Sequence, residues 1–210
     1  MKKSIVALCL MLGFSGAFAV DKSGFFGGAG IGLQGMKQVV EYSAANFSST
    51  RTTRYPSLSV FAGYKLMKDE ADSSFAKFGV RVYANYEYNP VNEIYILRSY
   101  DKQETNKLYH IIGLNADYLF NFTDKFGAFF GANFAVVAWD ELFSLDGKSD
   151  YDGYFAYQLG LRTALKDMGE VELLVKFPLA KTEQTSSTYN GITNTLQQTY
   201  NVALRYVINF

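Results

Sequence analysis

The sequence is poor in the residues that most often carry catalysis or bind metals. It has 210 residues, of which one is cysteine and one is histidine. Disulfides, zinc sites and Cys–His catalysis all need several of these side chains, so we expect no disulfide, no metal site and no cofactor. Lysine plus arginine number 20, as do aspartate plus glutamate, and this balance predicts no nucleic-acid partner.

Proline and long apolar runs are also scarce. The chain has three prolines, and no segment beyond its start reaches the run of about eighteen apolar residues that a membrane-spanning helix needs. In contrast, 16 tyrosines, 18 phenylalanines and 18 glycines stand beside only 19% charged residues. This composition is typical neither of a disordered chain nor of a charged helical bundle. It leaves a soluble β-protein or a membrane β-barrel.

The N-terminus predicts export. Lys2 and Lys3 precede an apolar run over residues 5–14, and Ala17-Phe18-Ala19 follows with small residues at the two positions that a signal peptidase reads. The run is too short to span a bilayer as a helix. We therefore predict a signal peptide over residues 1–19, cleaved after Ala19, and a mature protein over residues 20–210.

The mature chain alternates with a period of two residues. Apolar and polar side chains alternate over segments of about ten to sixteen residues, which places them on opposite faces of strands. These segments are 24–35, 55–66, 74–89, 107–120, 126–139, 153–165, 170–179 and 200–210. They are about twice as long as strands of soluble proteins and match the length that crosses a bilayer. The polar face is rich in small residues and carries few charges, as a narrow lumen requires.

The connections predict the topology. Those at 67–73, 121–125 and 166–169 are short, whereas those at 36–54, 90–106, 140–152 and 180–198 are long. Short periplasmic turns and long extracellular loops are typical of outer-membrane barrels. We therefore predict an all-β protein, an eight-stranded antiparallel transmembrane β-barrel with four long extracellular loops, in the bacterial cell outer membrane.

Aromatic residues fall where the two membrane interfaces would lie, as barrels require. The expected girdle at the short-turn end comprises Tyr64, Tyr118, Phe120, Phe122, Phe126 and Phe210. The girdle expected at the long-loop end comprises Tyr55, Tyr86, Tyr88, Trp139, Tyr154 and Tyr200.

The two ends of the mature chain resemble known barrel families. The last strand, with Tyr206, Ile208 and the terminal Phe210 on its apolar face, is similar to the assembly signal of bacterial outer-membrane barrels. The eight-strand plan is similar to the OmpA transmembrane domain and the OmpX class. The segment 24–30, GFFGGAG, resembles the opening strand of Helicobacter-type outer-membrane proteins. These resemblances imply the barrel-assembly machinery as a partner.

The inward-facing positions carry a cluster of charges. Buried charges must be paired or hydrated, and an eight-stranded barrel has an interior just wide enough for side chains. We expect these residues to form a plug of ion pairs; the alternative is a narrow, water-lined path. The cluster comprises Lys65, Lys77, Arg81, Asp117, Arg162, Glu170, Glu172, Lys176 and Arg205.

Two further motifs have structural explanations. Residues 30–35 fit G-x-G-x-x-G, but the following helix and acidic residue of a dinucleotide site are missing. We interpret Gly28, Gly30 and Gly32 as inward positions that leave room in the lumen. The single histidine, His110, alternates with Leu108 and Ile112 and is therefore expected on the lipid face near the outer rim. Because no serine–histidine motif surrounds it, we interpret it as a neutral interfacial residue and not as a catalytic one.

Three functions follow, in order of preference. The first is a non-enzymatic outer-membrane barrel with a structural or adhesin-like role, in which exposed loops bind a host or surface ligand. The second is a narrow porin-like channel for small solutes or ions. The third, remote function is a lipid-modifying enzyme. Outer-membrane lipid and lipopolysaccharide are the expected surroundings in each case.

Overall fold

The computed structural model describes residues 23–42, 47–68, 77–97, 101–123, 125–139, 151–165, 169–179, 183–188 and 192–210. The predicted signal peptide lies outside these residues. The strands are β1 (Gly24–Tyr42), β2 (Phe47–Met67), β3 (Lys77–Leu97), β4 (Asp101–Asn121), β5 (Phe126–Trp139), β6 (Tyr151–Leu165), β7 (Gly169–Pro178), β8 (Glu183–Thr188) and β9 (Ile192–Asn209). Within this part of the chain, no helix is long and apolar enough to cross a membrane.

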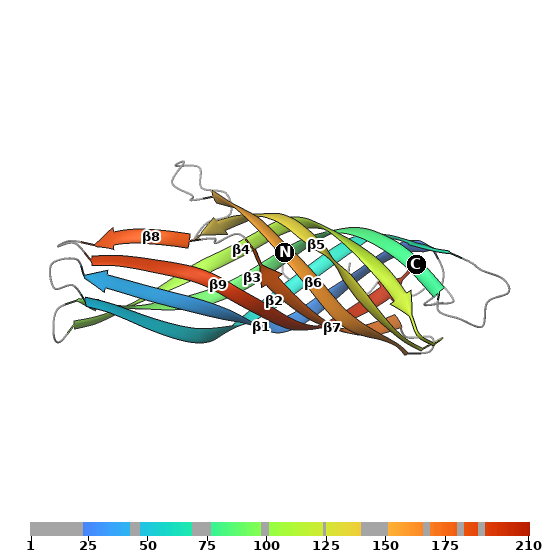
Figure 1. Ribbon diagram of the computed structural model, residues 1–210, viewed down its shortest axis with the longest axis horizontal. Coiled ribbons are helices and arrows are strands. Elements are labelled where there is room, and N and C mark those ends of the chain that lie inside the picture. The colour runs from blue at the N-terminus through green and yellow to red at the C-terminus, as the bar shows by residue number, and fades with distance from the viewer. Residues whose placement is uncertain are drawn as a thin grey trace, which may run out of the picture.

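Eight of these strands close into a barrel. Neighbours pair antiparallel in the order β1 to β7 and then β9, and β9 pairs with β1 to complete the wall. The tilted strands form an elongated barrel whose C-terminal end lies away from β8 (Figure 1). The predicted eight-stranded fold is therefore confirmed. Closure leaves no open edge in the wall, as a strand structure in lipid requires.

Three of the expected loop segments are largely strand. The hairpin of β1 and β2 pairs as far as Tyr42 and Phe47, and the hairpin of β3 and β4 as far as Leu97 and Asp101. In the fourth expected loop, β8 pairs with the outer part of β9. Residues 140–150 of the third expected loop lie outside the described residues. The wall thus continues as paired strands toward the end of the molecule at which β8 lies (Figure 1).

Each of the three prolines lies two residues beyond the last pair of one ladder, although Pro56 and Pro90 stay paired on the other side of their strands. The β2–β3 ladder ends at Leu58 and Tyr88, and the same register continued by two residues would set Pro56 against Pro90. Neither proline has an N–H to donate to a ladder. Pro178, the third proline, is the last residue of β7. Among the described residues, the outer part of the protein is therefore divided into a β2–β1–β9–β8 sheet and a separate β3–β4 hairpin.

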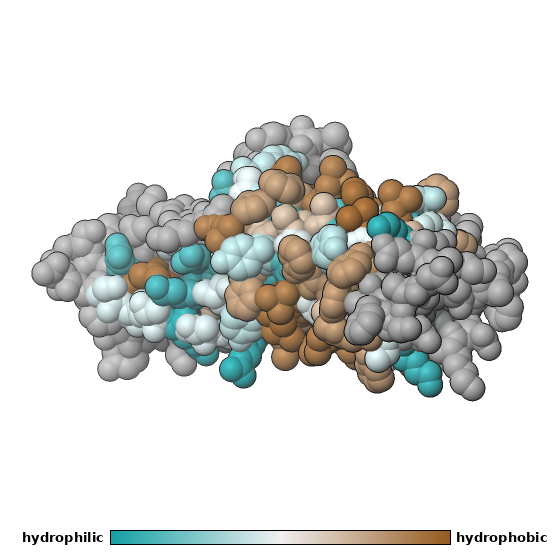
Figure 2. Space-filling view, turned by 45° about the vertical axis from the view of Figure 1, so that its right-hand side comes forward, coloured by the Kyte–Doolittle hydropathy of each residue, from teal (hydrophilic) through white to brown (hydrophobic). Residues whose placement is uncertain are grey.

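The two faces of the wall have reversed polarity relative to a soluble protein. Large apolar side chains point outward, among them Phe25 at 68%, Ile31 at 63% and Phe130 at 62% exposure. On the face shown in Figure 2 they gather into a band, with polar residues over the outer extension. Apolar surface costs about 25 cal/mol per Å² in water, so this band requires lipid. The predicted period-two alternation is confirmed.

Candidate functional site: the charged lumen

Charged side chains fill the interior of the barrel. Among the described residues, the buried side chains include five cations, Lys65, Arg81, Arg162, Lys176 and Arg205, and four carboxylates, Glu87, Asp117, Glu170 and Glu172. Eight of the nine predicted cluster residues are thus brought together in the lumen. The ninth, Lys77, begins β3, and its side chain lies outside the described residues.

Strand register explains why these side chains meet. Arg81 on β3 is paired with Lys65 on β2 and with Asp117 on β4. On the other side of the barrel, Glu172 on β7 is paired with Arg162 on β6 and Arg205 on β9. Directly opposite residues of an antiparallel pair share a face and have Cβ atoms about 5 Å apart. Each half of the wall therefore presents alternating charges to the other half.

Glu172 lies between two arginines at the centre of the cluster. Its Oε1 accepts a hydrogen bond from Arg81 Nη1 at 2.5 Å, and its Oε2 accepts one from Arg205 Nη2, also at 2.5 Å. Arg81 donates in addition through Nε to Asp117 Oδ2 at 2.8 Å. The contact between Arg81 and Glu172 crosses the lumen from β3 to β7, so it joins opposite sides of the barrel. Charge-assisted bonds of this kind are stronger than neutral ones.

Aromatic and amide groups complete the central layer. The Tyr83 hydroxyl accepts hydrogen bonds from Arg205 Nη1 at 3.0 Å and from Gln158 Nε2 at 2.8 Å. The Arg81 guanidinium lies 4.5 Å from the centre of the Phe129 ring, and that of Arg205 lies 4.9 Å from the Phe61 ring. Both guanidiniums are therefore held by carboxylates and by aromatic faces.

A second ion pair cluster lies nearer the short-turn end. Glu170 accepts hydrogen bonds from Lys65 Nζ at 2.9 Å and from Asn209 Nδ2 at 2.8 Å. Arg162 Nε lies 3.3 Å from the other carboxylate oxygen of Glu170. Glu170 thus gathers groups from β2, β6 and β9 and closes the lumen below the central layer.

A third layer lies toward the outer end. Lys176 on β7 forms an ion pair with Glu87 on β3, and Asn85 donates to the same Glu87 oxygen at 2.9 Å. Asn115 Nδ2 in turn donates to Asn85 Oδ1 at 2.7 Å. The charged layers are therefore continuous with a network of asparagines.

Apolar side chains gather toward the outer end of the lumen. They form one buried cluster that comprises Met36, Tyr109, Ile111, Val137, Tyr154 and Ala156. From this cluster, the Tyr109 hydroxyl donates to Gln198 Oε1 at 3.2 Å, and Gln198 Nε2 donates to Gln34 Oε1 at 3.2 Å. An ion moving through the barrel would have to pass this apolar layer as well as the three charged layers.

Glycine makes room for the long charged side chains. A Cβ added at Gly30 would lie 2.7 Å from Ser59 Oγ and 2.9 Å from Arg205 Cγ, distances that real Cβ atoms do not adopt. The structure thus supports the interpretation of the glycine motif as lumen space.

Sequence reasoning missed two members of the network. Glu87 and Tyr83 have the same strand parity as Arg81, so both could have been assigned to the lumen from their odd positions on β3. In the sequence, Glu87 lies farther from the short turns than the predicted cluster, and Tyr83 carries no charge. A cluster defined by charges near the short turns therefore includes neither residue.

The aromatic girdles are confirmed at one end and corrected at the other. Tyr64, Phe122, Phe126 and Phe210 are exposed at the short-turn end, and Phe78 contacts both Tyr118 and Phe120. At the outer end, however, Tyr154 is only 3% exposed and Tyr55 packs against the inner apolar cluster. Both face the lumen because their strand parity places them there. The Trp139 side chain lies outside the described residues.

His110 has the expected outward strand parity and is paired with Tyr88, but its side chain is only 6% exposed and so is covered by its neighbours. It stacks on Tyr86, whose hydroxyl lies 2.9 Å from His110 Nδ1, and its ring also contacts Tyr88. The described contacts of this histidine are with tyrosines. Within the described part of the chain, no group of three or more His, Cys, Asp and Glu side chains could hold a metal ion.

The residues of the predicted assembly signal lie on the outward face of β9 and just beyond its end. Tyr206 is 39% and Phe210 is 54% exposed, and Ile208 has the same parity and is half-buried. Their role in assembly stays a prediction.

Comparisons with known proteins place this barrel among outer-membrane proteins. A model of the family described as Helicobacter outer membrane protein matches residues 59–210. No curated protein matches the sequence. Of the solved structures, Neisserial surface protein A (NspA) is similar at 14% identity and a TM-score of 0.41, covering 88% of this chain and 97% of that one.

Two further solved structures are similar. The attachment invasion locus protein Ail of Yersinia pestis, in complex with the heparin analogue sucrose octasulfate, has 10% identity and a TM-score of 0.35, covering 88% of this chain and 99% of that one. The outer membrane protease OmpT from Escherichia coli has 8% identity and a TM-score of 0.38, covering 90% and 98% respectively.

Proposed function

The chain belongs to the Helicobacter outer membrane protein family and is an outer-membrane β-barrel, and from this premise we propose that it is a non-conducting, non-enzymatic barrel that acts at the cell surface through its outer strands. The observation that carries this proposal is the filled lumen. Four buried carboxylates form ion pairs with cations, and three of these carboxylates, Glu87, Glu170 and Glu172, do so across the lumen. An apolar layer lies above them. Such a lumen supports a scaffold better than a path for solutes.

The outer extension supports a role in surface recognition. Beyond the apolar band, β1 and β2 remain paired from Met36 and Thr53 to Tyr42 and Phe47. The side chains of residues 48–52 on β2 are exposed and polar. Strands that are fixed to a rigid barrel hold such side chains in defined positions, which favours recognition of a ligand on a host or neighbouring cell surface.

Shortening one hairpin tests the surface role. Replacing residues 38–51 by Asn-Gly would join Lys37 to Thr52, which face each other in the ladder, through a two-residue turn. We expect vesicles that carry this variant to lose adhesion to host-type cells, while the barrel still folds. The matched control replaces the short turn at 122–125 by Asn-Gly on the other side of the membrane. Equal adhesion of both variants and the parent would contradict the proposal.

A channel is the second candidate function, and the charges in the lumen predict which ions such a channel would prefer. Five buried cations face four buried carboxylates among the described residues, so a conducting lumen would carry a net positive charge and prefer anions. The reversal potential across a planar bilayer in a salt gradient reports this preference. A stable, anion-selective current would favour the channel over the scaffold.

A further inference from the structure

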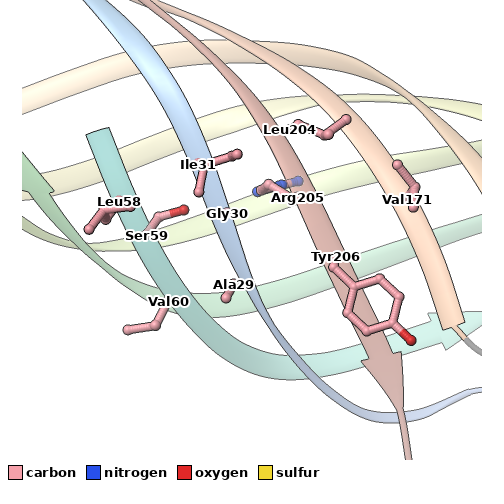
Figure 3. Close-up of a pocket in the computed structure, with 10 residues that line it drawn as sticks. All are labelled: Ala29, Gly30, Ile31, Leu58, Ser59, Val60, Val171, Leu204, Arg205 and Tyr206. Atoms are coloured by element: carbon pink, nitrogen blue, oxygen red, sulfur yellow. The ribbon is translucent and has the colours of Figure 1, made fainter. Parts of the chain in front are cut away.

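A shallow furrow crosses the lipid-facing surface of the wall. It has a volume of about 460 Å³ and is formed by β2, β1, β9 and β7. Figure 3 shows Leu58 and Val60 on one side of β1, and Leu204 and Tyr206 on the other. The small residues Ala29 and Gly30 lie between these walls. The furrow is thus a depression in the apolar band, and not a gap in the band made by polar groups.

A fixed cation lies above the same strands. Arg54 on β2 is exposed and donates from Nε to the Tyr200 hydroxyl at 3.1 Å. Arg54 and Tyr200 are both paired with Gly35, one on each side of β1. Arg54 is four residues above Leu58, or about 13 Å along the strand. The guanidinium thus lies at the outer end of the apolar band, where lipid headgroups begin.

The local backbone is adapted to hold this guanidinium. An added Cβ at Gly35 would lie 2.8 Å from Tyr200 Cδ1 and 2.7 Å from Thr199 Oγ1, so only glycine lets the Tyr200 ring reach across β1. A register shift between Gly35 and Met36 makes Thr199 an extra residue on β9, and Thr199 donates to the Gly35 carbonyl at 3.0 Å. Tyr200 is therefore fixed as a neutral support for Arg54.

The charge around Arg54 is positive. Lys37 occupies the next outward position on β1 beyond Gly35, diagonal to Arg54. The first carboxylate farther out on this face of β1 is Glu41, two outward positions beyond Lys37. Within the described part of the chain, no carboxylate forms an ion pair with Arg54 or Lys37. An anion is thus favoured directly above the furrow.

We propose that this face binds a phosphorylated acyl lipid of the outer leaflet, with an acyl chain in the furrow and a phosphate on Arg54. The chemistry matches the phosphorylated acyl-glucosamine anchor of lipopolysaccharide. Arginine forms paired hydrogen bonds with phosphate, and the furrow contacts the chain below it. The site depends on the outer-membrane location and is independent of whether the lumen conducts or the outer strands recognise a partner.

Native mass spectrometry of the full barrel in micelles, titrated with lipid A, tests the site. We expect Arg54→Gln to weaken retention of lipid A about tenfold, as for loss of a charge-assisted contact. Ala29→Phe, which fills the furrow, should weaken it as well. The matched controls are Arg51→Gln, on the opposite face of β2, and Ala116→Phe, an outward alanine on β4; both should retain lipid A as the parent does. Gel mobility before and after heating confirms that each variant is folded.

Two probes separate the parts of the proposed ligand. Dephosphorylated lipid A should bind the parent and Arg54→Gln equally weakly, and inorganic phosphate alone should not displace lipid A. Equal binding of lipid A and its dephosphorylated form, or full binding by folded Arg54→Gln, would overturn the proposal. Displacement by inorganic phosphate would also overturn it, because the furrow would then contribute nothing.

Discussion

The charged side chains of β7 face the lumen and bind partners on strands that are distant in the sequence. The alternation on β7 predicts that Glu170, Glu172 and Lys176 face inward, and all three are buried. Parity does not predict partners, because Lys65 reaches Glu170 across the barrel rather than along a ladder. The partners of these side chains depend on strand tilt and on barrel closure. The period-two alternation of the sequence gives neither of these.

At Glu172, neutralising one carboxylate should destabilise the whole barrel. Glu172→Gln would leave Arg81 and Arg205 facing each other without the anion that lies between them. Removing one member of a buried ion pair costs about 3 to 5 kcal/mol. We expect a loss of this size in the free energy of unfolding, measured with urea in lipid vesicles. Asp152→Asn, at an exposed position, is the control; an equal effect of both changes would contradict the interpretation.

We expect His110 to contribute to packing between tyrosines and to have no catalytic role. His110→Phe keeps an aromatic ring between Tyr86 and Tyr88 but removes the hydrogen bond to the Tyr86 hydroxyl. We expect a loss of about 1 kcal/mol in the free energy of unfolding and an unchanged lipid composition of the membranes that contain the variant. Loss of a modified lipid species, detected by mass spectrometry of extracts, would instead indicate an enzyme.

At the scale of strands, polarity predicts the membrane segments well and the outer segments poorly. The polarity of residues 48–53, SSTRTT, predicts a loop, yet these residues belong to β2. Outside the membrane both faces of a strand meet water, so the period-two signal disappears. Threonine nevertheless favours strands, and pairing with β1 supplies the rest. Composition could therefore have indicated the extension where alternation could not.

We expect Pro56 and Pro90 to determine where along the barrel axis β2 and β3 separate. We expect the double variant Pro56→Thr, Pro90→Val to extend the ladder beyond Leu58 and Tyr88, because each position regains an N–H. Hydrogen exchange followed by mass spectrometry should then show slower exchange in peptides that cover residues 50–57 and 89–95. The single variants restore one donor each and should show a smaller effect. Unchanged exchange in the double variant would mean that the prolines do not cause the split.

At the scale of the whole molecule, the barrel reverses the usual arrangement of a soluble protein. Its apolar side chains face outward, and its interior is charged and closed by layers from Glu170 to the apolar cluster around Tyr109. Although the net charge of the sequence is zero, charges of both signs are therefore concentrated inside the barrel. That arrangement supports the proposed role as a scaffold over a role as a pore.

Single-channel recording of the refolded protein in a planar bilayer tests this central claim most directly. We expect no conductance steps from the parent barrel. The double variant Arg81→Ala, Glu172→Ala removes the bond across the lumen without leaving that pair half intact, and should raise the frequency of opening events if it folds. Regular, long-lived conductance steps from the parent protein would contradict the account, whereas a silent bilayer with folded, inserted barrel would support it.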